Sequence, residues 1–221
     1  MITSRLLKTT PAQPMIARTI GWIFILAAVC EGCLSRPHLN RQSFTFTAPA
    51  IPRATAVSNG RVLAIRTLQI AAPFNGRSLV YRTGEFSYDR DPYAEFLVSP
   101  NEALVSLIRS SLRGAGAFSD VMESGGALKA NTLLEISVSQ LYGDFRQPQH
   151  PAAVLAMRFV FLDTPHGVPE KVIFEQDYSR SILLRGRTAA ALMEGWNEAL
   201  YQVLAEVISD FDHSKIGTAG L

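Results

Sequence analysis

Two thiols, four imidazoles and one acidic cluster are the residues best suited to chemistry. Cys30 and Cys33 are the only cysteines, so the chain beyond residue 33 cannot hold a disulfide framework, a cysteine-based zinc site or a catalytic thiol. The four histidines lie far apart in the sequence and show no metal-ligand spacing: His38, His150, His166 and His213. We therefore expect neither a metal site nor a bound cofactor.

The acidic cluster Asp89-Arg90-Asp91 supplies two carboxylates that could act in acid-base catalysis. A solvated turn is the competing interpretation, and we favour it because no catalytic motif accompanies the cluster. The sequence contains no Gly-x-Ser-x-Gly elbow, no phosphate-binding glycine loop and no His-Glu-x-x-His. These features predict a protein that is not an enzyme, and a secreted hydrolase with an unrecognised triad is kept only as a minor alternative.

The composition of the 221-residue chain is that of a globular protein, with 48% hydrophobic and 18% charged residues. Its net charge of +2 comes entirely from the N-terminus, where Arg5, Lys8 and Arg18 outnumber Glu31. The rest of the chain is neutral and has no stripe of basic residues, which binding to phosphate backbones requires. We therefore exclude nucleic acid as a partner.

The most apolar segment, residues 20–30, suits the core of a signal peptide. It is about half as long as the roughly 20 residues that a membrane-spanning helix needs. Arg18 supplies the positive charge in front of it, and Met15 is a second candidate for the start of translation. Residues 1–32 are therefore predicted to be a signal peptide for export.

The signal ends at Cys30-Glu-Gly-Cys33-Leu-Ser, which resembles the lipobox of bacterial lipoproteins. Gly32 stands at the small position and Cys33 at the acylated one. The resemblance implies that Cys33 carries acyl chains, such as palmitate, that anchor the mature protein to a membrane. Leu34, in place of Asp, implies sorting to the periplasmic face of the outer membrane. Anchoring in the inner membrane, cleavage by an ordinary signal peptidase and an uncleaved anchor are the alternatives.

Hydrophobic periodicity predicts one α+β domain over residues 61–212. A proline-containing tether with one short edge strand at 43–47 precedes it at residues 33–60, and a flexible tail follows at 213–221. Within the domain, Ser99-Pro-Asn-Glu102 has the form of a capping box and predicts a helix that ends before Gly116. A second amphipathic helix is predicted over residues 188–211.

Strands are predicted on both sides of the first helix, with a hairpin turn at Thr83-Gly84. Their ranges are 61–71, 78–82, 85–88, 132–141, 152–163 and 172–184. The strand at 152–163 is almost continuously apolar, so we expect it to be covered on both faces. The element order favours a two-layer α+β sandwich, in which a mainly antiparallel sheet carries both helices on one face.

Five aromatic residues gather around the hairpin and the segment before the first helix: Tyr81, Phe86, Tyr88, Tyr93 and Phe96. Packing in the core and at its rim is the first interpretation. A binding surface for a partner or for an acyl chain is the second, because exposed aromatic side chains favour interfaces. These five residues are therefore the candidates for partner or lipid binding.

A further pattern is spread over nearly the whole mature chain. It comprises the signal ending at Cys33, the edge strand at 43–47, Leu79-Val-Tyr-Arg82, Tyr88, Asp91-Pro-Tyr-Ala-Glu95 before Pro100, Leu112-Arg-Gly-Ala-Gly-Ala-Phe-Ser-Asp-Val121, the strand from Leu133 and Phe161-Leu-Asp163. Together these segments resemble the ABC-type transport auxiliary lipoprotein family. Tyr93 stands where many relatives have Trp.

The resemblance implies a periplasmic lipoprotein that works beside an ABC transporter with a mammalian-cell-entry-type substrate-binding protein. Such a system moves phospholipids or other hydrophobic molecules between the inner and outer membranes, and this component has no ATPase of its own. The resemblance also implies assembly into a homo-oligomer, which no residue pattern shows. The alternative function is a lipid carrier that encloses an acyl chain between its sheet and helices.

Overall fold

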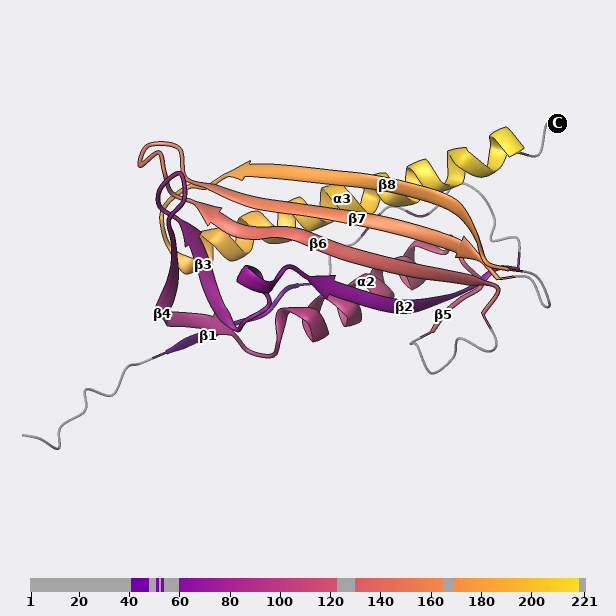
Figure 1. Ribbon diagram of the computed structural model, residues 1–221, viewed down its shortest axis with the longest axis horizontal. Helices are drawn as coiled ribbons and strands as arrows, with labels where there is room; N and C mark the ends of the chain where they lie inside the picture. The colour runs from indigo at the N-terminus through magenta and orange to yellow at the C-terminus, as the bar shows by residue number, and fades with distance from the viewer. Residues whose placement is uncertain are drawn as a thin grey trace, which may run out of the picture. The chain divides into compact units, whose positions relative to one another are not determined.

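The computed structural model describes residues 41–47, 51, 53, 60–122, 130–164 and 169–218. The predicted signal peptide, Cys33 and most of the predicted tether lie outside the described residues, as do the last residues of the predicted tail. The residues from Arg41 onward belong to one structural unit, drawn in Figure 1. Its described elements form one sheet and two long helices.

Three long strands make up the centre and one edge of the sheet: β6 (Thr132–Asp144), β7 (Ala152–Asp163) and β8 (Lys171–Leu183). β7 lies between the other two and pairs with each of them in an antiparallel arrangement along almost its whole length. The expectation that β7 is covered on both faces is wrong. Its row with Phe159 is buried, whereas Arg158 in the other row is exposed and forms ion pairs with Glu175 and Asp177 of β8.

The remaining strands are arranged along the other side of β6. β2 (Val62–Ile70) pairs in parallel with the first half of β6, and β3 (Ser78–Arg82) pairs in parallel with its end. The short β5 (Asp120–Met122) extends the sheet beyond β2. Beyond β3 come β4 (Tyr88–Phe96) and then β1 (Gln42–Phe44), which is an edge strand close to the range predicted for one.

Both helices cover the same face of the sheet, as Figure 1 shows. Helix α2 (Pro100–Ala115) begins at the predicted capping box, where Ser99 Oγ accepts a hydrogen bond from Glu102 N at 3.2 Å. It ends at Gly116, whose φ of 71° places it in the left-handed region. Helix α3 (Ala189–Thr218) continues beyond the predicted end at residue 211. The predicted two-layer α+β sandwich is therefore confirmed.

The core fills the space between the sheet and the helices. In α3, Trp196 is completely buried and donates a hydrogen bond from Nε1 to the carbonyl oxygen of Val154 in β7 at 3.1 Å. One turn of this helix approaches β7 closely at Gly195. A Cβ atom there would lie 2.7 Å from the Cβ of Ala153, nearer than real Cβ contacts come. Gly195 is therefore required for α3 to lie against the strand.

Candidate functional site

The candidate site is the corner of the sheet formed by β1, β3 and β4, which we call the β4 corner. β3 and β4 form the predicted antiparallel hairpin, and the amides of Thr83 and Gly84 close its turn on the carbonyl oxygen of Ser87. The second strand begins at Tyr88 and continues to Phe96, so it lies later in the chain than the predicted 85–88. Four of the five aromatic candidates lie in these two strands, and Phe86 lies in the turn between them.

Asp91 organises the middle of β4. Its Oδ1 accepts hydrogen bonds from the backbone N–H groups of Tyr93 and Ala94 at 2.8 and 2.9 Å, and its Oδ2 accepts one from the hydroxyl of Tyr81 at 2.5 Å. These bonds hold an irregular stretch of strand between two regions of regular pairing with β3. The interpretation of residues 89–91 as a turn is wrong, because they belong to a strand and the Asp91 carboxylate shapes its backbone.

The hydroxyl of Tyr81 is half-buried above Asp91. Burial raises the pKa of Tyr81 well above its usual value, and the hydrogen bond to the Asp91 carboxylate raises this pKa further. On its other side the Tyr81 ring stacks on Phe145, with 4.8 Å between the ring centroids. Tyr81 therefore holds β4 against the end of β6 and has little surface left for a partner.

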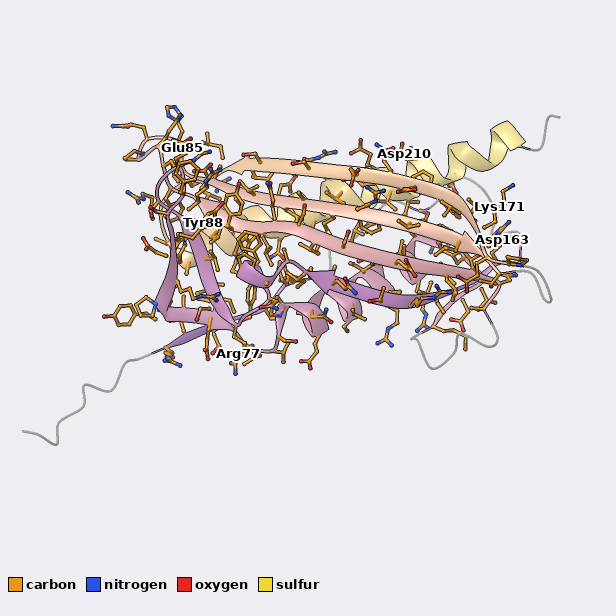
Figure 2. The ribbon with its side chains drawn as sticks, viewed as in Figure 1. Arg77, Glu85, Tyr88, Asp163, Lys171 and Asp210 are labelled. Atoms are coloured by element: carbon orange, nitrogen blue, oxygen red, sulfur yellow. The ribbon has the colours of Figure 1, made fainter. Side chains whose placement is uncertain are left out.

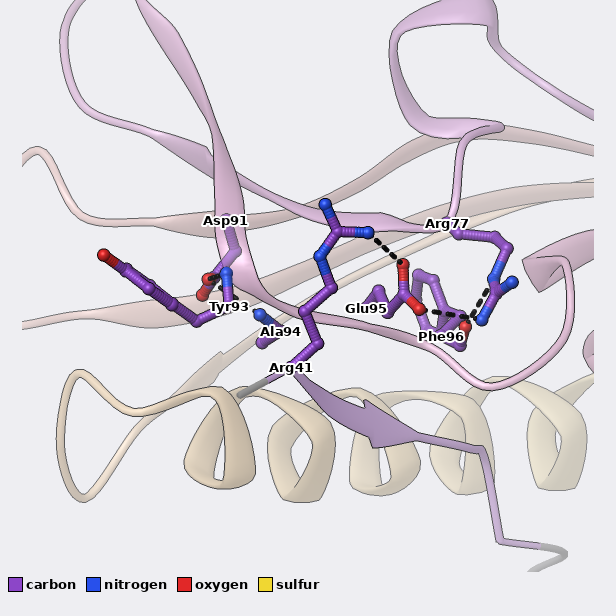
Figure 3. A network of polar contacts seen from close by, with 7 residues as sticks. All are labelled: Arg41, Arg77, Asp91, Tyr93, Ala94, Glu95 and Phe96. Atoms are coloured by element: carbon purple, nitrogen blue, oxygen red, sulfur yellow. Dashed lines mark hydrogen bonds and ion pairs between the residues drawn. The ribbon is translucent and has the colours of Figure 1, made fainter. Parts of the chain in front are cut away.

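A network of two arginines and one carboxylate fixes the place where the described domain begins (Figure 3). Arg41, directly before β1, forms an ion pair with Glu95 at 3.8 Å, and Arg77 forms a second one at 2.9 Å. Arg77 Nε also donates to the carbonyl oxygen of Phe96 at 2.8 Å. Glu95 therefore links the start of the domain to β4 and to the segment before β3.

The side chain of Phe96 belongs to the core. It is 2% exposed and stacks on Trp196 of α3 and on Phe46, with ring centroids 5.8 and 5.4 Å apart. For this candidate, burial supports the packing interpretation. Any contact of Phe96 with a partner would require the sheet and helix to separate.

The other candidates lie at the surface but do not form one patch. Tyr93 is 55% exposed, and Figure 3 shows its ring pointing away from Arg41 and Glu95. Phe86, in the hairpin turn, is 88% exposed. Tyr88 is 44% exposed, and its ring lies edge-on to Tyr142 at 5.6 Å. The structure thus places Phe86 and Tyr88 at the turn end of the hairpin and Tyr93 farther along β4.

The chemistry available to the described residues is limited. No group of three or more His, Cys, Asp or Glu side chains among them could hold a metal ion. In the same part of the chain, no helix combines the length and the apolar character that crossing a membrane requires. A hollow of about 260 Å³ at the β4 corner is lined by charged side chains, among them Arg41, Arg90, Asp91 and Glu95. Its lining suits polar groups better than an acyl chain.

Several residues of the site were not singled out from the sequence. Arg41, Arg77 and Glu95 are far apart in the chain, and the pairing of β4 with β1 on one side and with β3 on the other brings them together. Leu97 and Leu183 are exposed apolar residues at strand ends, at 57% and 63%. The sequence contains a weak indication for Leu183. This residue lies near the apolar end of the predicted strand at 172–184, directly before a segment that contains Arg185 and Arg187.

Comparisons with known proteins support the fold. No protein-family model matches the chain, and no curated protein matches it. Among solved structures, it is similar to a Xanthomonas campestris protein of the DUF330 family, with 14% identity over 81% of this chain and 100% of that one and a TM-score of 0.68. An uncharacterized protein is similar with 12% identity over 76% and 99% and a TM-score of 0.57.

A lipoprotein from Neisseria meningitidis is also found, with 10% identity over 67% of this chain and 98% of that one. Its TM-score of 0.34 is too low to support an argument. The two higher TM-scores show that the α+β architecture is shared with other proteins. At such low identities, none of these similarities says what this chain does.

Proposed function

We propose that this protein is a lipid-anchored periplasmic component of an ABC-type system that moves phospholipids or other hydrophobic molecules between the inner and outer membranes. The observation that carries the proposal is Cys33, which stands where the apolar signal ends and shortly before the folded domain begins at Arg41. A cysteine at this place suits acylation. Several acyl chains would hold the domain at a membrane, because each buried methylene contributes about 0.8 kcal/mol.

The architecture of the β4 corner agrees with this arrangement. The ion pair of Arg41 with Glu95 and the pairing of β1 with β4 fix where the tether joins the domain. At roughly 3.4 Å per residue, the chain between Cys33 and Arg41 reaches at most about 27 Å. An anchor at Cys33 therefore keeps the β4 corner close to the membrane surface.

The family resemblance adds the transport role. Three of the segments that carry it form neighbouring strands in the structure, in the order β1, β4 and β3. Exposed Tyr93 on β4 offers an aromatic side chain to a partner, and aromatic residues are enriched at interfaces. We propose that this corner contacts the mammalian-cell-entry-type subunit of the transporter and that the protein performs no catalysis itself.

A lipid-carrier function has less support. The space between sheet and helices is occupied by tightly packed rings, such as Phe161 and Phe211, whose centroids are 4.5 Å apart. A hollow of about 510 Å³ between β2 and α2 is lined by polar residues such as Arg66, Asn101 and Glu102 together with the apolar Ile65, Leu68 and Val105. Acyl-chain cavities are mainly apolar, so no feature of the described residues favours the carrier over the anchored component.

Intact mass spectrometry of the membrane-extracted protein tests the anchor. We expect a mature chain that starts at Cys33 and carries added acyl mass. Cys33→Ser should remove this mass and release the protein from membranes, whereas the matched control Cys30→Ser should change neither. An unmodified mature chain, or a Cys33→Ser variant that is still processed and acylated, would contradict the proposal.

Affinity purification of the acylated protein tests the transport role. We expect ATPase and substrate-binding subunits of one ABC transporter to co-purify, and Tyr93→Lys to reduce their recovery. Val172→Lys, a charge placed at an exposed apolar residue of β8 on the other edge of the sheet, is the matched control. Recovery without any ABC transporter subunit would contradict the role and leave the anchor unaffected.

A further inference from the structure

Three loops leave the sheet at the same end. Strand pairing joins Leu183 of β8 to Ala152 of β7, Ala152 to Asp144 of β6, Asp144 to Arg82 of β3, and Arg82 to Tyr88 of β4. These five residues form one row across the sheet. The loops 83–87, 145–151 and 184–188 follow directly from this row, and we call them the tip loops. Figure 2 shows Glu85 and Tyr88 at this end and Asp163 and Lys171 at the opposite end.

Apolar side chains are exposed at the tip loops, while other residues of these loops are buried in the domain. Phe86 is the most exposed of the large hydrophobic residues described, and Leu183 is 63% exposed at the end of β8, which β6 and β7 separate from the hairpin. In contrast, Phe145 and Leu184 are buried and hold the other two loops to the domain. The exposed side chains therefore project from a well-packed base.

The charge of this end is positive. Arg82, Arg146, Arg185 and Arg187 lie in the row and the loops, whereas the acidic residues there are Glu85 and Asp144. Asp144 is already paired with Arg146 at 2.5 Å. Within the part of the chain that the structure describes, neither Arg185 nor Arg187 forms an ion pair, although Arg187 lies 4.9 Å from the centre of the Phe145 ring. Cationic groups are thus available at the same end of the sheet as the exposed Phe86.

We propose that the tip loops form a contact surface for a bilayer with anionic phospholipids. Phe86 enters the boundary between headgroups and acyl chains, and Arg185 and Arg187 bind the phosphate groups around it. Arginine donates several N–H groups in a planar fork that suits phosphate oxygens. Exposed aromatic residues beside basic residues are the pattern by which proteins attach to anionic membrane surfaces.

The position of the anchor favours a bilayer over a protein partner. Gln42 pairs with Ala94 in β4, and this strand runs from there to the tip loops. At roughly 3.4 Å per residue, Ala94 lies about 27 Å from Phe86, while the chain from Cys33 to Gln42 can extend about 30 Å. An anchor at Cys33 can therefore reach the level of the tip loops, so that both meet the same membrane. In this respect the inference rests on the proposed acylation.

Fluorescence quenching in membranes tests the contact. The full acylated chain carrying Phe86→Trp is reconstituted into vesicles of phosphatidylcholine and phosphatidylglycerol with brominated acyl chains. We expect bromine to quench the added Trp emission, measured against the unsubstituted chain, whose mature form from Cys33 onward contributes only Trp196. Tyr93→Trp, on β4 away from the tip loops, is the matched control and should be quenched much less.

Charge reversal tests the role of the arginines. In the Cys33→Ser chain, binding to phosphatidylglycerol vesicles is measured by flotation. Arg185→Glu should weaken it about tenfold or more, because each basic residue near an anionic surface contributes substantially to binding. Lys171→Glu makes the same charge change at the opposite end of the sheet and should leave binding almost unchanged. High salt should reduce binding of the parent chain.

The outcomes separate this inference from the proposed function. Acylated protein that resides in vesicles without quenching at position 86 would overturn the membrane contact and leave the anchor intact. Equal losses from Arg185→Glu and Lys171→Glu would also overturn it, because they would indicate nonspecific charge attraction. A missing acyl mass at Cys33 with strong quenching at position 86 would instead reject the anchor and retain the contact surface.

Discussion

Aromatic residues only a few positions apart in this chain have opposite environments. Phe96 lies in the core against Trp196, whereas Tyr93 is exposed. Positions three apart lie on opposite faces of a strand, and the burial of β4 follows this alternation from Tyr93 to Phe96. Pro92 and two aspartates are poor strand formers, so the sequence indicated an aromatic cluster but not the strand that divides it into core and surface.

This division predicts different costs for similar substitutions. Phe96→Ala should lower the free energy of unfolding by about 3–5 kcal/mol, because it removes a buried ring and leaves a cavity beside Trp196. Tyr93→Ala should change it by less than about 0.5 kcal/mol. Urea denaturation followed by circular dichroism measures both. A large loss from Tyr93→Ala would show that its ring packs in solution.

The Asp91 carboxylate should matter more for stability than the Tyr81 hydroxyl, from which it accepts a hydrogen bond. Asp91→Ala leaves two backbone N–H groups and one hydroxyl without their acceptor and should cost about 1–3 kcal/mol. Tyr81→Phe removes only the hydroxyl and should cost about 1 kcal/mol. Comparing the two denaturation midpoints tests the ranking, and a reversed order would mean that Asp91 does not shape β4.

Two tyrosines should make stability depend on pH in the alkaline range. Burial raises the pKa of Tyr178, as it does for Tyr81, and a hydrogen bond from its hydroxyl to Asp210 at 2.9 Å raises it further. An unfolded tyrosine loses its proton near about pH 10, while the folded ones keep theirs. The unfolded chain then binds fewer protons, so stability should fall as the pH rises above about 10.

Urea midpoints between about pH 7 and 11 measure this effect. The double variant Tyr81→Phe/Tyr178→Phe should be less stable at neutral pH but should lose stability less steeply above about pH 10. Parallel curves for the parent and the double variant would contradict the assignment. Below about pH 9, these two groups should add no pH dependence.

At the scale of elements, the sequence is informative where periodicity is long. Both helices and the strands β2, β6, β7 and β8 are recognisable from their apolar patterns and, for α2, from its capping box. Two elements are not. β5 has three residues, too few for a pattern, and β4 contains Pro92 and two aspartates, which are poor strand formers.

The partners of strands are harder to predict than the strands. β2 reads as a buried strand, yet its parallel pairing with β6 depends on a partner roughly seventy positions away. The row of β7 that contains Arg158 shows a second limit. Its apolar residues suggest cover on both faces, but the sheet has a helix layer on only one, and the exposed Arg158 is the residue that shows this.

Gly195 in α3 and Gly114 in α2 predict opposite effects of the same substitution. Gly195→Ala should destabilise the protein, because its Cβ would lie 2.5 Å from Leu184 Cδ2 and 2.7 Å from Ala153 Cβ. Gly114→Ala places a Cβ in open space on α2 and should stabilise by about 0.5–1 kcal/mol through helix propensity. Thermal denaturation measures both. Stabilisation by Gly195→Ala would show that α3 lies farther from β7.

Across the molecule as a whole, the strands of the sheet differ in how extensively they are paired with their neighbours. β6 and β7 are paired on both sides along much of their length, whereas β1 pairs with β4 over only three residues at the edge. Hydrogen exchange should therefore be slowest in β6 and β7 and much faster in β1. Glu95→Gln, which weakens the ion pairs with Arg41 and Arg77, should speed exchange in β1 and at the start of β3 but not in β6 and β7. Uniform exchange across the sheet would contradict this picture.

The pairing of β2 with β6 also bears on the time course of folding. Neither β1 nor β2 pairs with the strand that follows it in the chain, so the first two strands gain their partners only after long loops have closed. A topology with such separated contacts folds slowly compared with a helical bundle. For the export that we propose, this delay is an advantage, because a chain that is still unfolded can pass through a membrane before its sheet assembles on the other side.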